Sequence, residues 1–139
     1  MARIKHIAIA TEDLEGTTKF YIDGLGLQKV GEVNSPVAKG VYLTDGYINL
    51  AVLQFLDDYV ATTEGAPKYR GGHHFGLEVE DLESAREQIE RAGAVHKPSP
   101  VAAAHSGEIR RGSNVEVKFN GPDGVMIDLS QSGWVGTGE

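Results

Sequence analysis

The sequence predicts an α+β fold in which two βαβββ modules form a cupped mixed sheet around a central cavity. The string Glu-Asp-Leu-Glu occurs at 12–15 and again at 80–83, and in each copy a histidine precedes the aspartate by seven residues. An alternating strand precedes each string and a helical pattern follows it. The 139 residues are therefore predicted to form one domain, with module one at about 1–56 and module two at about 72–132.

Each module is expected to run strand, helix and then three strands. The first strands, at 6–10 and 74–79, alternate large apolar residues with histidine, alanine or glycine. Asp13 and Asp81 are suitable helix N-caps, because a short carboxylate accepts hydrogen bonds from the free N–H groups of the first turn. Gly24 and Gly93 are expected to end the helices. The other strands are expected at 27–33, 37–44 and 47–54, near Val95, and at 115–120 and 125–130, with a connector at 57–72 and a looser, flap-like segment at 98–113.

Alternation assigns the side chains of the first strands to two faces. His6 and His74 share a face with alanine and glycine, so this face is expected to line the cavity, while Ile7 and Ile9 pack against the helices. His73 is expected to point away from His74 and to serve in packing. Trp134 lies in a glycine-rich tail, where it is expected either to be partly exposed or to dock on a neighbouring subunit.

Composition excludes several classes of function. Thirteen Lys and Arg against 20 Asp and Glu give a net charge of -7, which argues against a nucleic-acid partner. The absence of cysteine excludes disulfides and thiolate metal sites. No apolar run is long enough to span a membrane, and no secretion signal is evident, so a cytoplasmic protein with a small-molecule substrate is expected.

Four polar residues are predicted to converge on the cavity face. His6 and His74 occupy equivalent places in the repeat, Asp128 lies between Ile127 and Leu129, and Asn49 has the corresponding place in module one. Two imidazoles with one carboxylate suit Fe, Mn, Ni, Co or Zn as a divalent ion, and leave positions open for substrate. The alternatives are hydrogen-bonded histidines without a ligand role and a solvated strand carboxylate.

These residues resemble the vicinal oxygen chelate superfamily, which includes glyoxalase I, methylmalonyl-CoA epimerase, extradiol dioxygenases and the fosfomycin and bleomycin resistance proteins. The motifs that carry the resemblance are His6-Ile-Ala-Ile-Ala with Asp13-Leu14, Phe20-Tyr21 before Gly24-Leu25-Gly26-Leu27, His73-His74-Phe-Gly-Leu with Asp81-Leu82, and Pro122-Asp123-Gly124 leading to Ile127-Asp128-Leu129. The resemblance implies a glyoxalase-like fold and a divalent metal held by His6, His74, Asp128 and Asn49.

The resemblance implies several activities. A lyase or isomerase of the glyoxalase or epimerase type is the first expectation, acting on a small substrate that chelates the ion through adjacent oxygens, with Asp128 as the catalytic base. Asn49 stands where the family often has Glu or Gln and cannot act as a base, while Asp128 is one methylene shorter than the usual Glu. An Fe(II) extradiol dioxygenase and a non-catalytic drug-binding resistance protein are the alternatives, and a homodimer is expected in each case.

Overall fold

The computed structural model describes residues 1–56, 69–97 and 116–138. The flap-like segment predicted at 98–113 and most of the predicted connector lie outside these residues. The described elements, in chain order, are β1 (Arg3–Ala10), α1 (Leu14–Leu25), β2 (Gln28–Asn34), β3 (Ala38–Thr44), β4 (Asn49–Phe55), β5 (Gly71–Glu78), α3 (Leu82–Arg91), β6 (Val95–Lys97), β7 (Glu116–Asn120), a 3-10 turn at Pro122–Gly124 and β8 (Met126–Ser130). The predicted double βαβββ order is confirmed.

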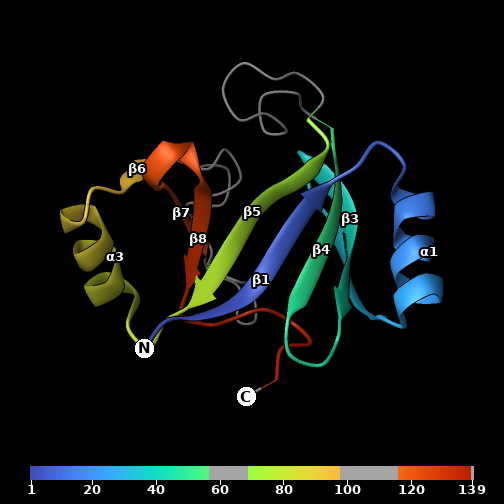
Figure 1. The fold of residues 1–139 in the computed structure, drawn as a ribbon, viewed down its shortest axis with the longest axis horizontal. Helices are drawn as coiled ribbons and strands as arrows, with labels where there is room; N and C mark the ends of the chain where they lie inside the picture. The colour runs from blue at the N-terminus through green and yellow to red at the C-terminus, as the bar shows by residue number, and fades with distance from the viewer. Residues whose placement is uncertain (57–68, 98–115, 139) are drawn as a thin grey trace.

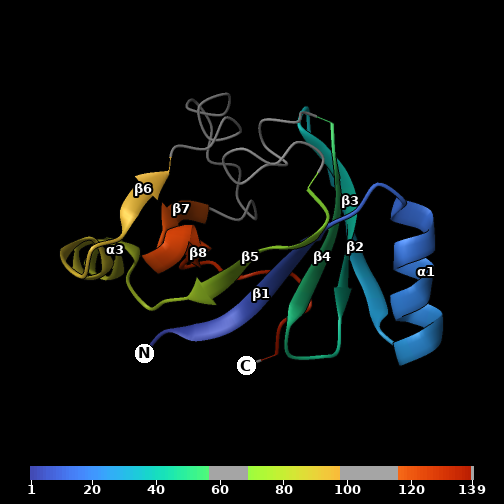
Figure 2. The same cartoon turned by 45° about the horizontal axis from the view of Figure 1, so that its top comes forward.

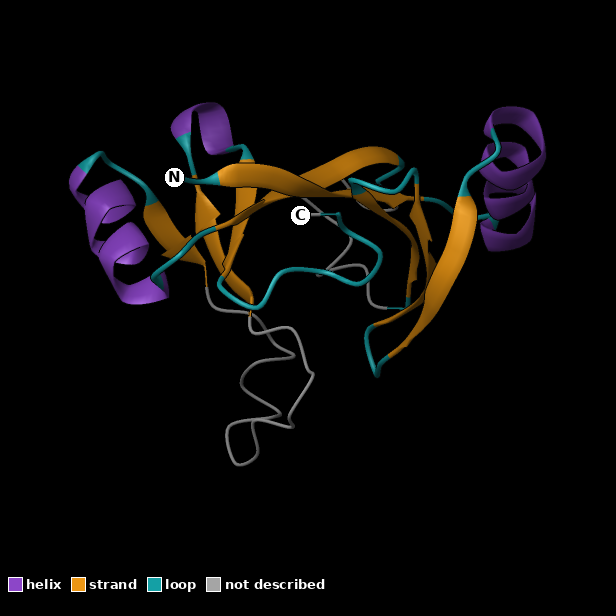
Figure 3. Ribbon diagram, turned by 90° about the horizontal axis from the view of Figure 1, so that it is seen from below, coloured by secondary structure: helices purple, strands orange, loops and turns teal. Residues whose placement is uncertain are grey.

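The eight strands form one sheet in the order β2-β3-β4-β1-β5-β8-β7-β6. The first strands of the two modules, β1 and β5, pair antiparallel at its centre, whereas β1 with β4 and β5 with β8 pair in parallel. This order places α1 and α3 at opposite ends of the molecule (Figures 1 and 2). Seen from below, the sheet forms an arch with both helices outside it (Figure 3). The predicted cupped mixed sheet is therefore present.

The predicted caps begin both helices. The Asp13 side chain accepts a hydrogen bond from the backbone N–H of Gly16, and the Asp81 side chain accepts one from that of Ser84. The predicted end of the first helix at Gly24 is wrong, because the helix runs to Leu25. Gly26 follows it with a φ of 75°, a left-handed conformation that glycine adopts without steric cost. Among the described residues, no helix has the length and apolar character needed to cross a membrane.

Each helix packs on the outer part of its own module. Apolar side chains of α1 lie against buried Leu43 and Val52, and those of α3 lie against buried Phe119 and Leu129. Because α1 lies on β4 and α3 on β8, the convex side of the central strands is left less covered. Ile7, expected to pack against a helix, is instead 39% exposed there.

The C-terminal tail, 131–138, crosses the concave side of the sheet inside the arch (Figure 3). Its backbone carbonyls accept hydrogen bonds from side chains of module one: Val135 O from Asn49, Gly136 O from Thr44 and Gly138 O from Lys5. The tail therefore ties the end of module two to module one across the face that carries the predicted site.

Candidate metal centre

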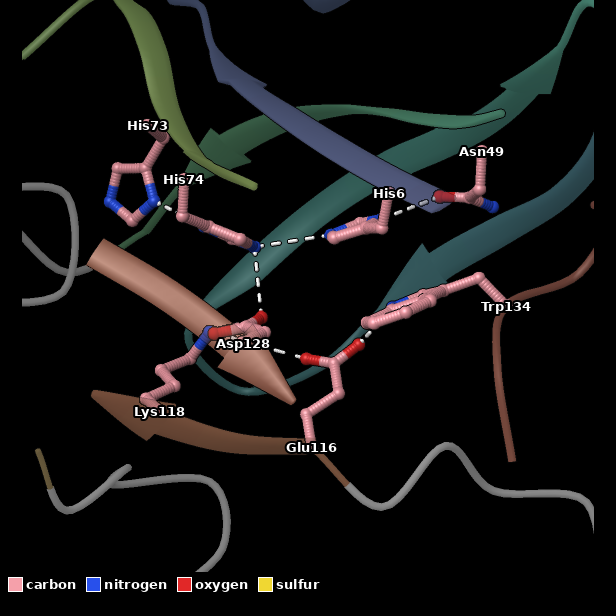
Figure 4. A network of polar contacts seen from close by, with 8 residues as sticks. All are labelled: His6, Asn49, His73, His74, Glu116, Lys118, Asp128 and Trp134. Carbon is pink, nitrogen blue, oxygen red and sulfur yellow. Dashed lines mark hydrogen bonds and ion pairs between the residues drawn. The ribbon is translucent and has the colours of Figure 1, made fainter. Parts of the chain in front are cut away.

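Three of the predicted site residues meet on the concave face (Figure 4). Nε2 of His6 lies 3.1 Å from Nε2 of His74, and Nε2 of His74 lies 3.1 Å from Oδ2 of Asp128. One donor atom from each side chain lies within 4.8 Å of the others. We call His6, His74 and Asp128 the His–His–Asp cluster. The antiparallel β1–β5 pair brings the two histidines together, and β8, parallel to β5, brings the carboxylate.

The spacing within this cluster fits a divalent transition-metal ion. Nitrogen and oxygen ligands lie about 2.0–2.2 Å from such an ion, so neighbouring donors are about 2.8–3.1 Å apart in an octahedral shell and about 3.3–3.6 Å apart in a tetrahedral one. Both 3.1 Å contacts, from His6 to His74 and from His74 to Asp128, match the octahedral spacing. Imidazole with carboxylate suits Zn, Mn, Fe, Co and Ni, which is the predicted set of metals.

Burial keeps both cluster histidines in the form that binds a metal. Desolvation lowers the pKa of His6 to about 4 and that of His74 to about 4, although Asn49 opposes the shift at His6 and Asp128 opposes it at both. Both rings are therefore neutral near pH 7 and can offer a lone pair. At His6 the lone pair belongs on Nε2, because Nδ1–H donates to Oδ1 of Asn49 at 2.7 Å.

Asn49 contacts the side of His6 that faces away from the cluster. Its Oδ1 accepts from Nδ1 of His6, and its Nδ2 donates to the carbonyl of Val135 at 2.9 Å. The strand registers explain why Asp128 reaches the cluster and Asn49 does not. Asn49 lies directly beside His6, whereas Asp128 lies beside Gly76, two residues beyond His74. Asn49 is thus placed to orient His6, and the three other predicted residues form the cluster.

Asp128 is fully buried and has a cation beside it. Burial alone would raise its pKa, but Lys118 and then His74 outweigh this effect and hold the pKa of Asp128 well below its ordinary value. Nζ of Lys118 lies 2.8 Å from each carboxylate oxygen. The Asp128 carboxylate is therefore ionised near neutral pH, as a metal ligand must be.

Two further site residues, Glu116 and Lys118, were missed by the sequence reasoning. They alternate with Val117 on β7, so they share one face, and Lys118 pairs in register with Asp128. Burial, with a contribution from Asp128, raises the pKa of Glu116 to about 7. Nε1–H of Trp134 donates to Oε1 of Glu116 at 2.6 Å. The period-two spacing at 116 and 118 is the sequence signal that could have placed both residues at the cavity.

His73 was expected to point away from the site, but it contacts His74. The two Nδ1 atoms lie 2.7 Å apart, and the His73 ring packs against Phe55. The β1–β5 register shifts at this point: His74 pairs with Ala8, and the next pair along the two strands is Gly72 with Ile9. This bulge disturbs the strict alternation on which the expectation depended.

Trp134 is buried within its own chain. It is 4% exposed, and its ring stacks on His6 with an interplanar angle of 2° and a centroid separation of 4.7 Å. A Cβ at Gly76 would lie 2.6 Å from Cη2 of Trp134. Glycine at this position therefore leaves the space that the indole fills, and the expectation of an exposed or intermolecular tryptophan is wrong.

The fold and this site define a glyoxalase-like protein. Two repeated modules pair through their first strands, and each of these strands gives one histidine to a shared concave face. The sequence comparison agrees: the family described as "Glyoxalase/Bleomycin resistance protein/Dioxygenase superfamily" matches residues 3–129. The chain belongs to this superfamily.

Two curated relatives and one solved structure are similar over most of the chain. A probable lactoylglutathione lyase of Synechocystis sp. is 28% identical over 91% of this chain and 93% of the relative. A probable chloroplastic lactoylglutathione lyase of Arabidopsis thaliana is 26% identical over 94% of this chain, which spans only 36% of that protein. The solved structure is that of a variant of Streptomyces coelicolor methylmalonyl-CoA epimerase in complex with 2-nitronate-propionyl-CoA. It matches with a TM-score of 0.69 at 23% identity, over 92% of this chain and 95% of the epimerase chain, and supports the fold.

Proposed function

We propose that the chain is a metal-dependent lyase or isomerase of the glyoxalase type whose divalent ion is held by the His–His–Asp cluster. The observation that carries the proposal is the convergence of two neutral imidazoles and one ionised carboxylate at ligand spacing. The lyase names of the two curated relatives support the class of reaction. The substrate expected from the sequence, a small molecule with adjacent chelating oxygens, suits a cluster that uses only three donors.

When bound, the ion would act as a Lewis acid that stabilises negative charge on a substrate oxygen. The chain's own residues prepare the site for this task. Asn49 fixes the ring of His6 so that Nε2 faces the cluster, and the indole of Trp134 covers one face of that ring. The indole excludes water from that face of the ring, and both contacts hold the donor in place.

In this proposal Asp128 is a metal ligand rather than the catalytic base. A carboxylate with two contacts to Lys118 and one to His74 accepts a proton poorly, because protonation would leave the half-buried ammonium uncompensated. The predicted role of Asp128 as the catalytic base would require the Lys118 contact to loosen when substrate binds. This role stays a prediction, and so do the homodimer and the cytoplasmic location.

An extradiol Fe(II) dioxygenase is the second candidate. It is favoured by one observation: Asn49 contacts the far nitrogen of His6, so the described donors facing the cluster are two histidines and one carboxylate. This set is typical of non-haem Fe(II) oxygenases. Consumption of oxygen by the iron-loaded protein with a catechol would favour this candidate.

The proposal is tested by proton exchange in D2O. The protein is loaded in turn with Ni, Co, Mn, Zn and Fe(II), and incubated with an α-hydroxy ketone or a thioester bearing an acidic C–H. We expect NMR to show metal-dependent exchange at the carbon beside the carbonyl, lost in His6→Ala and His74→Ala. His96→Ala is the matched control, since His96 is exposed on β6. Exchange that needs no metal, or that survives loss of both cluster histidines, would refute the proposal.

A further inference from the structure

Lys118 supplies a cation that the proposed chemistry leaves unassigned. It lies on β7 opposite Asp128, and its side chain is 19% exposed. Nζ contacts both oxygens of Asp128 at 2.8 Å, one of which is the oxygen that contacts His74. The ammonium is therefore one contact away from the donors of the cluster, at the border between the buried site and solvent.

The second carboxylate nearby does not hold Lys118 closely. Oε2 of Glu116 lies 4.0 Å from Nζ, at the limit for an ion pair, while Oε1 accepts the hydrogen bond from Trp134. The indole thus holds Glu116 against the tail. Asp128 is the close anionic partner of Lys118 within the described part of the chain.

The charges of this site do not cancel when an ion is present. The ion and Lys118 bring three positive charges, Asp128 brings one negative charge, and the histidines and Asn49 are neutral, so two positive charges remain. Even an ionised Glu116 would leave one. In a site shielded from water, uncompensated charge is costly and attracts an anion.

We propose that the site takes an anionic chelating substrate, a 2-hydroxy or 2-oxo carboxylic acid, and that Lys118 is the specificity-determining residue that contacts its carboxylate. This inference rests on the proposed function, because the adjacent oxygens of the substrate need the ion. A carboxylate next to a hydroxyl or carbonyl oxygen supplies both the chelating pair and the missing negative charge. A neutral hydroxy ketone or amide supplies only the first.

The test compares two probes of the same shape on the Co(II)-loaded protein. Glycolate and glycolamide differ in one charged group, and the visible absorption of bound Co(II) reports on binding without any turnover. We expect glycolate to bind more tightly than glycolamide, and Lys118→Met to reduce this preference roughly tenfold to a hundredfold, the usual worth of a hydrogen bond to a charged group. Lys118→Arg should retain most of the preference, since it keeps the charge. Lys39→Met, which removes an exposed lysine of β3, is the matched control and should leave it unchanged.

The outcomes separate this inference from the proposed function. Equal affinity for the two probes, or an unchanged preference in Lys118→Met, would overturn the inference while leaving the metal site intact. Failure of the wild-type protein to bind Co(II) would refute the proposed function and, with it, the inference. Co(II) affinity measured on each variant, together with its circular dichroism, shows whether the variant is folded.

Discussion

Replacement of Trp134 by alanine tests whether the tail is part of the folded structure. The side chain is 4% exposed, stacks on His6 and donates to Glu116. A tryptophan buries about 150–250 Å², and truncation of a buried one to alanine typically costs about 3–5 kcal/mol. Since domains of this size are stable by only about 5–15 kcal/mol, Trp134→Ala should remove a large share of the unfolding free energy.

A second substitution separates packing from hydrogen bonding. Trp134→Phe keeps an aromatic ring against His6 but loses the donor to Glu116, so we expect a cost of roughly 1–3 kcal/mol. Unfolding in urea is followed by far-ultraviolet circular dichroism, because Trp134 is the only tryptophan and its fluorescence is lost with it. Val135→Ala, at a residue 44% exposed, is the matched control and should change stability little. A cost below about 1 kcal/mol for Trp134→Ala would refute the docked tail.

Three other perturbations test separate parts of the structure. Gly76→Ala should displace the indole and shift its fluorescence to the red, because the new Cβ would lie 2.6 Å from Trp134. Gly72→Ala, on the same strand with no atom within 4 Å of its Cβ, is the control and should not shift the fluorescence. Equal emission spectra for the two variants would contradict the packing of Trp134 against Gly76. Asn49→Leu should weaken metal binding about tenfold to a hundredfold in competition with a chelator, because it removes the partner that orients a ligand; unchanged affinity would argue against the orienting role. In the metal-free protein, burial lowers the pKa of both cluster histidines from 6.5 to about 4. Between these two pH values the unfolded chain therefore binds more protons than the folded one. The unfolding free energy should fall as the pH drops from about 6.5 to about 4. Glu116, with its pKa raised to about 7, binds its proton preferentially in the folded state and so opposes this trend. Urea titrations of Glu116→Gln at several pH values should therefore show a steeper fall of the unfolding free energy. An unfolding free energy that does not change with pH in this variant would contradict the burial argument.

The fold could be predicted because both copies of the repeat show local sequence patterns that indicate their strands and helices. Alternation marks the strands, and Asp13 and Asp81 begin both helices as N-caps. Helix ends were less certain: Gly24 and Gly26 are equally acceptable stops by local rules, and only the folded chain shows that the left-handed residue is Gly26. The exposure of Ile7 likewise depends on which strands the helices cover, which is a tertiary property.

The site could be predicted in part, for the same reason. His6, His74 and Asp128 follow from the repeat and from strand alternation. The contact of Asn49 with Nδ1 of His6 depends on a register difference between the modules, and that of His73 with His74 depends on a bulge. These features arise from pairing between strands, and the sequence of one strand does not encode them.

The sequence analysis missed Lys118 and placed Trp134 wrongly, and the two failures have different reasons. The alternation of Glu116 and Lys118 is visible in the sequence, but a short strand with exposed charges has the same pattern. Trp134 reaches His6 across a separation of most of the chain, and the space for it depends on Gly76 in a third segment. Long-range packing of this kind leaves no local signature.

The central claim is that His6, His74 and Asp128 bind one divalent ion together. The most direct measurement is a crystal structure of the Mn(II)- or Co(II)-loaded protein, with the ion located by anomalous scattering. We predict one site per chain, about 2.0–2.2 Å from Nε2 of both histidines and from one oxygen of Asp128. An ion bound elsewhere, or a fully loaded crystal in which Lys118 and His74 alone still surround Asp128, would contradict it.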